Sequence, residues 1–214
     1  MKITFLHTSK SHIKRFNQII NEIDNTIETK HFVNEELLET ALKTNQIDVQ
    51  GFKNEILKIR TNEMESIICT CSTYGELCEE DEKVYRIDKP MVELIVSNYS
   101  KIGLAFTVSS TKEISKNLIL NIAKKQGKEI QIKEIDCQNC WKYFEMGNTD
   151  KYTFEIANQI KKMGNDCEVI FLAQASMEKV KPYLLKEKYK TVSSPKYGIE
   201  KHLERIKKDY AKIN

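Results

Sequence analysis

The chain has 214 residues, of which 40% are hydrophobic and 30% charged, which is ordinary for a globular protein with a sizeable core. Its net charge is +3, and arginine supplies four of its 34 basic residues, whereas nucleic-acid-binding proteins depend on arginine and cluster their basic residues on one face. No apolar run approaches the ~20 residues that span a bilayer, so we expect a cytoplasmic protein that binds neither nucleic acid nor membranes.

The first half of the chain alternates short apolar runs with longer amphipathic stretches. Residues 3–6 predict a strand, and residues 14–23 predict a helix because their apolar positions share one face. Continued in the same way, the pattern predicts strands at 3–6, 29–33, 66–70 and 84–87, and helices at 14–23, 34–42, 52–61, 74–80 and 90–99.

The same alternation begins again at Lys101. It predicts strands at 101–107, 129–135, 168–172 and 191–192, and helices at 111–125, 149–163, 177–185 and 198–213. Gly127 is expected to end the first of these helices in a left-handed conformation. Repeated strand–helix alternation predicts an α/β fold of two similar lobes, each a mainly parallel sheet flanked by helices. We place the first lobe at 1–97 and the second at 98–197.

Polar residues follow the predicted strands, where parallel sheets bind their ligands. These strand ends offer hydroxyls, amides and a thiol with little charge, which suits an anionic carboxylate bound by hydroxyls and helix amides. The alternative is that each serine or threonine caps a helix. The candidate substrate-binding residues are Thr8, Ser9, Ser72, Thr73, Thr107, Ser110, Thr111, Gln174, Ala175 and Ser176.

Cys71 is the candidate catalytic residue. It follows a predicted buried strand and precedes a predicted helix, and a helix amino terminus lowers the pKa of a thiol. We expect an accessible thiolate that acts as a general base or a nucleophile. The alternative is an inert buried cysteine, which is the interpretation we give to Cys69.

The remaining cysteines give no clear metal site. Cys137 and Cys140 form a single CxxC pair, whereas a structural zinc site needs a second pair or histidines at ligand spacing. We therefore expect no bound metal, and a redox or metal protein built on this pair is a minor alternative.

Four segments carry a resemblance to a known family, the last of them residues 193–195, Ser-Ser-Pro, which resemble its closing segment. Residues 68–75, Ile-Cys-Thr-Cys-Ser-Thr-Tyr-Gly, resemble the first catalytic-cysteine segment of the aspartate/glutamate/hydantoin racemase superfamily. Residues 103–111 resemble the segment that opens the second lobe of that family, and residues 171–176 fall where the family has its second cysteine. The similarity runs through nearly the whole chain in order.

The resemblance implies a pseudo-twofold pair of lobes, with the site in the cleft between them and the terminal helix, 198–214, packed back on the first lobe. It implies an isomerase that works without pyridoxal phosphate, metal or any other cofactor. One cysteine would remove the α-proton of a small amino or dicarboxylic acid, and another would return a proton to the opposite face. Cys71 would be the first of these, and Thr73, Thr107, Ser110 and Thr111 would bind the carboxylate. Homo-oligomer formation stays open.

Gln174 departs from the family pattern because it stands where the second cysteine is expected. A carboxamide has no useful acid or base function near neutral pH. Two alternatives to a racemase therefore stay open. One is a single-cysteine decarboxylase or lyase of the same superfamily, and the other is a small-carboxylate-binding protein without catalysis.

Overall fold

The computed structural model describes residues 2–60 and 66–213. The chain divides into two compact units, 1–90 with 195–214 and 91–194. The boundary predicted at 97/98 lies near the end of a helix, Lys89–Asn98, most of which belongs to the second unit. No helix within the described residues is long and apolar enough to cross a membrane.

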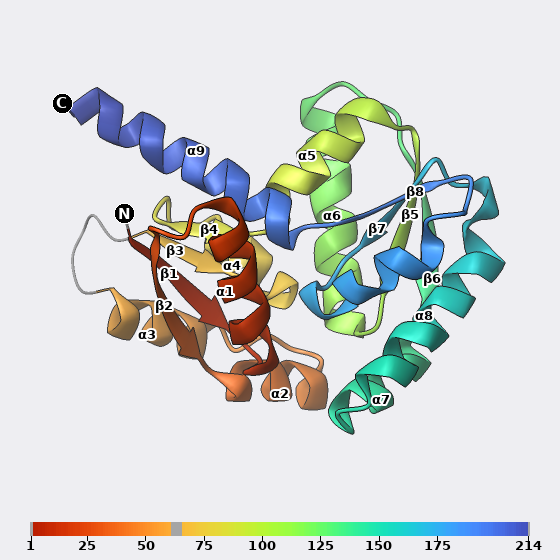
Figure 1. Cartoon of the computed structure of the whole chain (residues 1–214), viewed down its shortest axis with the longest axis horizontal. Helices are drawn as coiled ribbons and strands as arrows, with labels where there is room; N and C mark the ends of the chain where they lie inside the picture. The colour runs from red at the N-terminus through yellow and green to blue at the C-terminus, as the bar shows by residue number, and fades with distance from the viewer. Residues whose placement is uncertain (1, 61–65, 214) are drawn as a thin grey trace. The chain divides into compact units, whose positions relative to one another are not determined.

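A four-stranded parallel sheet forms the centre of the first unit, in the order β2-β1-β3-β4. Figure 1 shows helices on both sides of it. The elements of this unit are β1 (Lys2–His7), α1 (Ser11–Ile23), β2 (Glu28–Val33), α2 (Glu35–Thr44), α3 (Val49–Ile59), β3 (Ile67–Cys69), the 3-10 turn η1 (Ser72–Tyr74), α4 (Gly75–Cys78), β4 (Val84–Arg86) and the terminal helix α9 (Pro195–Ile213).

Alternation along β1 assigns its side chains to the two faces of this sheet. Phe5 and His7 contact Phe16 of α1, whereas Leu6 belongs to an apolar cluster with residues of α2 and α3. Successive side chains of a strand point to opposite faces, so a strand buried on both sides is apolar almost throughout. On its other flank, α1 contacts α9, and Lys196 pairs with Glu22 at 3.3 Å.

The second unit repeats this topology with its own parallel sheet, in the order β6-β5-β7-β8. In both units the first strand of the sheet lies between its second and third strands, which confirms the predicted α/β fold of two similar parallel sheets. Its elements are α5 (Lys89–Asn98), β5 (Lys101–Phe106), α6 (Ser109–Lys125), β6 (Gln131–Asp136), η2 (Gln138–Cys140), α7 (Trp141–Glu145), α8 (Thr149–Met163), η3 (Gly164–Asp166), β7 (Val169–Leu172), η4 (Ala175–Leu184) and β8 (Lys190–Ser193).

Two predicted helices differ from the observed elements. The segment after β7 forms the 3-10 helix η4, with Pro182 inside it; proline lacks the amide hydrogen that an α-helix needs there. The segment after β3 forms the three-residue turn η1 and the four-residue helix α4 in place of one longer helix. The turn at Gly127 is confirmed, with a φ of 63°.

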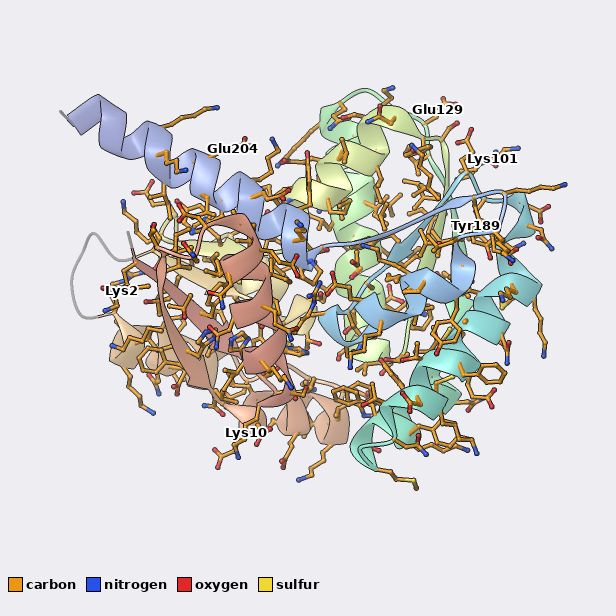
Figure 2. The ribbon with its side chains drawn as sticks, viewed as in Figure 1. Lys2, Lys10, Lys101, Glu129, Tyr189 and Glu204 are labelled. Atoms are coloured by element: carbon orange, nitrogen blue, oxygen red, sulfur yellow. The ribbon has the colours of Figure 1, made fainter. Side chains whose placement is uncertain are left out.

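Figure 2 marks the ends of both sheets by labelled side chains. In the first unit Lys2 begins β1, and Lys10 lies in the loop after its carboxyl end. In the second unit Lys101 begins β5, and Tyr189 directly precedes β8. The candidate site residues lie after the carboxyl ends of the strands, which is where parallel α/β sheets bind their ligands.

Candidate active site

Cys71 and Thr8 form the centre of a half-site at the carboxyl end of the first sheet. Leu6 and Cys69 are register partners in β1 and β3. Thr8 and Cys71 each lie two residues further along, so their side chains continue the same face of the sheet. The Thr8 hydroxyl is hydrogen-bonded to the Cys71 sulfur, and Thr73 donates to that sulfur through its backbone amide and its hydroxyl. Cys71 therefore has three hydrogen-bond donors around it.

The environment of Cys71 nevertheless keeps the thiol protonated. Its side chain is 9% exposed and belongs to an apolar cluster with Leu6, Cys69 and Tyr74. Burial raises the pKa of the Cys71 thiol to about 11, the nearby Cys69 adds to the rise, and the donors from Thr8 and Thr73 act against it. Desolvation favours the neutral thiol more strongly than three hydrogen bonds favour the thiolate.

The expectation of an accessible Cys71 thiolate is therefore wrong, because the thiol is buried and its pKa is raised. It assumed a full helix after β3, whose amino terminus would lower the thiol pKa. Instead, η1 has three residues and α4 has four, and Cys71 is buried. What the half-site offers is a neutral thiol with donors placed to stabilise the thiolate once it has given up its proton.

This geometry predicts how Cys71 reacts with iodoacetamide as pH changes. The thiolate is the reactive species, so the modification rate of Cys71 should rise about tenfold per pH unit between pH 7 and about 10 and level off near pH 11. Peptide-resolved mass spectrometry measures the rate at each cysteine separately. A rate that is already level at pH 7 would show that Cys71 is ionised there and would contradict a raised pKa.

The second sheet carries an equivalent half-site, with a carboxamide in place of the thiol. Ala105 and Leu172 are register partners in β5 and β7, and Thr107 and Gln174 each lie two residues further along. Thr107 donates to the Gln174 side-chain oxygen Oε1 from its amide at 2.7 Å and from its hydroxyl at 2.9 Å. The pair Thr107–Gln174 thus repeats the pair Thr8–Cys71 by position and by contact.

The hydrogen bonds of Thr107 fix the orientation of the Gln174 amide. A backbone N–H can only donate, so the atom that faces it must be the carboxamide oxygen. The Thr107 hydroxyl donates its one hydrogen to the same oxygen, so it can only accept from the buried Tyr152 hydroxyl, which lies 3.2 Å away. Because Tyr152 thereby uses its own hydrogen, it accepts from the Ser176 hydroxyl at 3.0 Å. Within the described residues the Gln174 Nε2 has no hydrogen-bond partner, and it is available as a donor of two hydrogens.

Tyr152 was not predicted as a site residue. It lies on α8, where its apolar neighbours Ile156 and Ile160 indicate an ordinary core position. Burial raises its pKa to about 12, against the hydrogen bonds of Ser176 and Thr107, so it is a neutral donor at physiological pH. The one feature of the sequence that could have indicated a role in the site is the Tyr152 hydroxyl, because a buried tyrosine usually finds a hydrogen-bond partner for that group.

The other predicted residues lie at the same strand ends. Ser72 is buried in η1, and partly buried Ser9 bonds Ser11 through their hydroxyls at 2.8 Å. Ser110 and the buried Thr111 lie in the first turn of α6, after β5, and Ala175 begins η4 without a functional group. The structure thus brings Thr8, Cys71 and Thr73 together in the first unit, and Thr107, Gln174 and Ser176 together in the second.

A buried ion pair lies against the turn that follows Cys71. Arg86 donates from Nε and Nη2 to the Asp88 carboxylate at 2.7 and 3.0 Å, and their side chains are 3% and 1% exposed. A Cβ atom built on Gly75 would lie 2.5 Å from Nη2 of Arg86. Glycine at position 75 therefore lets the turn after Cys71 lie flat on the guanidinium.

The Cys137–Cys140 pair lies apart from both half-sites in sequence and lines a cavity of about 210 Å³ in the second unit, with Asp136, Lys142 and Glu155. Burial raises the pKa of the Cys137 and Cys140 thiols. Among residues 2–60 and 66–213, no three His, Cys, Asp or Glu side chains are grouped so that they could hold a metal ion.

Comparison with solved structures places the fold among racemases. The aspartate racemase of Picrophilus torridus is 16% identical, with a TM-score of 0.69 over 91% of this chain and 89% of its own. A glutamate racemase from Bacillus anthracis is 15% identical, with a TM-score of 0.72 over 94% and 80%. The allantoin racemase of Klebsiella pneumoniae is 11% identical, with a TM-score of 0.62 over 99% and 88%.

At these identities the likeness concerns the fold. The chain has the fold of the aspartate, glutamate and allantoin racemases, which is the fold that its resemblance to the superfamily predicted. No family model matches the sequence, and no curated protein matches it closely enough to count as a relative.

Proposed function

We propose that the protein is a cofactor-independent enzyme of the racemase or isomerase type that acts at the carbon next to the carboxylate of a small amino or dicarboxylic acid. Cys71 is the group that transfers the proton. The observation that carries this proposal is the thiol at the carboxyl end of β3 with the Thr8 hydroxyl, the Thr73 amide and the Thr73 hydroxyl directed at its sulfur, in a chain with the fold of three kinds of racemase.

The remaining residues are assigned by the chemistry that they offer. A carboxylate needs hydrogen-bond donors, and in the second unit the free Nε2 hydrogens of Gln174 provide them, together with the first turn of α6, which directly follows the Gln174 partner Thr107 in sequence. Ser9, Ser72, Ser110 and Thr111 complete the proposed binding residues. The assignment of each of these residues to the substrate is part of the proposal.

A one-thiol reaction is the second candidate, and two observations favour it. Burial raises the pKa of the Cys71 thiol to about 11, so the thiol is neutral near pH 7 and can donate a proton. Gln174 occupies the equivalent position in the second sheet and transfers no proton. Loss of carbon dioxide from an activated dicarboxylic acid would leave a carbanion that the Cys71 S–H protonates, and the three donors would then stabilise the thiolate until water returns a proton.

Proton NMR in heavy water tests these candidates on a panel of amino and dicarboxylic acids. Racemisation with deuterium incorporation at the α-carbon is the outcome expected of the racemase. Deuterium incorporation with retained configuration indicates a single working base, and carbon dioxide release with one deuterium in the product indicates the decarboxylase. Thermal stabilisation by an acid without exchange or turnover would contradict both enzymatic proposals and favour the binding protein.

The variant Gln174→Cys separates one-sided from two-sided proton transfer. If position 174 faces the substrate opposite Cys71, a thiol there should allow exchange with inversion, which the wild type lacks if it is a one-thiol enzyme. The matched control is Gln174→Ser, which is as small as cysteine but has no acidic proton near neutral pH. Equal rates of inversion in the two variants would contradict a proton-transfer position at residue 174.

A further inference from the structure

A chain of buried and partly buried hydrogen bonds lies on the opposite face of the first sheet from Cys71. The His7 Nδ1 atom lies 2.8 Å from the Thr70 hydroxyl oxygen, and its Nε2 lies 2.8 Å from Nδ1 of His31. The His31 Nε2 is 2.8 Å from the side-chain oxygen of Asn17, which also accepts a hydrogen bond from the Thr29 hydroxyl at 2.9 Å. The chain thus connects α1, β2 and β1 to the end of β3.

Each atom of this chain is paired when both histidines are neutral. The Asn17 oxygen only accepts, so His31 donates from Nε2 and accepts at Nδ1, and His7 donates from Nε2. The His7 Nδ1 then accepts the hydrogen of the Thr70 hydroxyl at 2.8 Å, and the other acceptor within reach of that hydroxyl, the Leu6 carbonyl oxygen, lies further away at 3.2 Å. The neutral state is supported by burial, which lowers the pKa of His7 to about 2, with His12 and His31 contributing, and also lowers the pKa of His31. A fully paired buried network fixes the positions of its members.

The position of the network connects it to the proposed site. Pairing of β1 with β3 ends at Leu6 and Cys69. Beyond it, the Thr70 amide donates to the Leu6 carbonyl oxygen at 3.0 Å, and the His7–Thr70 hydrogen bond adds a side-chain link between the two segments. Thr70 directly precedes Cys71, and His7 directly precedes Thr8, whose hydroxyl contacts the Cys71 sulfur. The bond between His7 and Thr70 is therefore the side-chain contribution to holding together the two backbone segments that carry the thiol and one of its donors.

Packing alone does not require these polar groups. The His7 ring stacks on Phe5 and meets Phe16 edge to face, with centroid distances of 5.7 and 5.2 Å. A phenyl ring would fill much of the same space, and replacing a buried hydrogen-bonded pair by apolar groups of similar shape costs little stability. The hydrogen bonds must therefore contribute something other than volume and apolar contact.

We infer that His7, His31 and Thr70 are positioning residues for Cys71: their hydrogen-bond chain sets the relative placement of the Cys71 and Thr8 segments. The catalytic meaning of this inference rests on the proposed function, because it assigns the network to the residue that transfers the proton. Its structural content does not, because the placement of Cys71 can be measured without any substrate.

The test compares Thr70→Val with Thr70→Ser. Valine keeps the shape of threonine and removes the hydroxyl, whereas serine retains the hydroxyl. At a fixed pH near 8, iodoacetamide should modify Cys71 about tenfold faster in Thr70→Val than in the wild type, because loss of one hydrogen bond lets this segment open. Thr70→Ser should stay within about threefold of the wild-type rate, as should His202→Phe, which replaces another buried histidine of this unit.

Cys78 provides the internal reference in the same digest. It is buried in the same unit, with its sulfur 3.3 Å from the Tyr74 carbonyl oxygen, so general unfolding would expose both cysteines. A rise at Cys71 without a rise at Cys78 supports positioning. A parallel rise at both cysteines, an unchanged Cys71 rate in Thr70→Val, or equal rates in Thr70→Val and Thr70→Ser would overturn it.

His7→Phe and the double variant His7→Phe/Thr70→Val keep the inference testable if Thr70→Val alone does not fold. If the two residues act as one unit, the double variant should change the Cys71 rate no more than either single variant, and additive changes would contradict the chain. With an acid that is turned over, kcat should fall about tenfold in Thr70→Val while KM stays within about twofold. Absence of turnover with a selective rise at Cys71 would contradict the proposed function and leave the positioning role intact.

Discussion

Replacing Cys71 by alanine is expected to lower the rate of proton exchange at the α-carbon by about 10²–10⁴-fold, the usual cost of losing a positioned general acid or base. The donors around its sulfur, from Thr8 and Thr73, remain in the variant but have no group to stabilise. Deuterium incorporation measured by NMR, for an acid that the wild type exchanges, gives the rate directly. Binding of the same acid, followed by thermal stabilisation, should persist.

Cys69→Ala is the matched control for this experiment. Cys69 lies in β3 and is 1% exposed, so its replacement should lower the melting temperature while exchange continues. If Cys71→Ala retains the wild-type exchange rate, or if both variants lose it to the same degree, the assignment of proton transfer to Cys71 is wrong.

Replacing Arg86 by alanine is expected to destabilise the protein by about 3–5 kcal/mol, because it leaves the Asp88 carboxylate charged and unpaired in the interior. The Asp88 side chain is 1% exposed, and its two oxygens accept both Arg86 hydrogen bonds. The variant also removes the guanidinium on which Gly75 lies. Urea unfolding followed by circular dichroism measures the loss.

Two further variants separate ion pairing from packing. Arg60→Ala breaks a pair with Asp81 whose side chains are 24% and 33% exposed, and it should cost under about 1 kcal/mol because solvent screens the pair. The double variant Arg86→Met/Asp88→Leu removes both buried charges and should recover much of the stability that Arg86→Ala loses. Equal losses for Arg86→Ala and Arg60→Ala would contradict a special role of the buried pair.

The sequence allowed most of the fold to be predicted, because hydrophobic periodicity reflects burial. The strands around Ile68, Leu104 and Phe171 are apolar almost throughout, which is typical of parallel strands covered by helices on both sides. The elements after β3 and β7 were less predictable. Pro182 and the short η1 turn depend on local backbone hydrogen bonding that periodicity does not describe.

The residues of the candidate site could be predicted from the sequence, whereas the pKa of its cysteine could not. Cys71, Thr8 and Gln174 could be selected from the ends of apolar strands because parallel sheets place their ligands there. The raised pKa of Cys71 could not, because it depends on desolvation by residues that are distant in sequence, such as Leu37 and Phe52. The same holds for Tyr152 and for the His7–His31 contact, which arise from tertiary packing.

Peptide-resolved alkylation in the presence of a small carboxylate tests most directly whether Cys71 belongs to the binding site. Cys167 serves as the internal control, because it is the one cysteine that is partly exposed and it lies before β7, away from the strand ends that carry the site. With an acid that stabilises the protein at saturating concentration, modification of Cys71 should slow at least about tenfold, while modification of Cys167 stays unchanged. An unchanged rate at Cys71, together with protection of Cys140, would contradict the proposed site and move the ligand to the cavity beside Cys137.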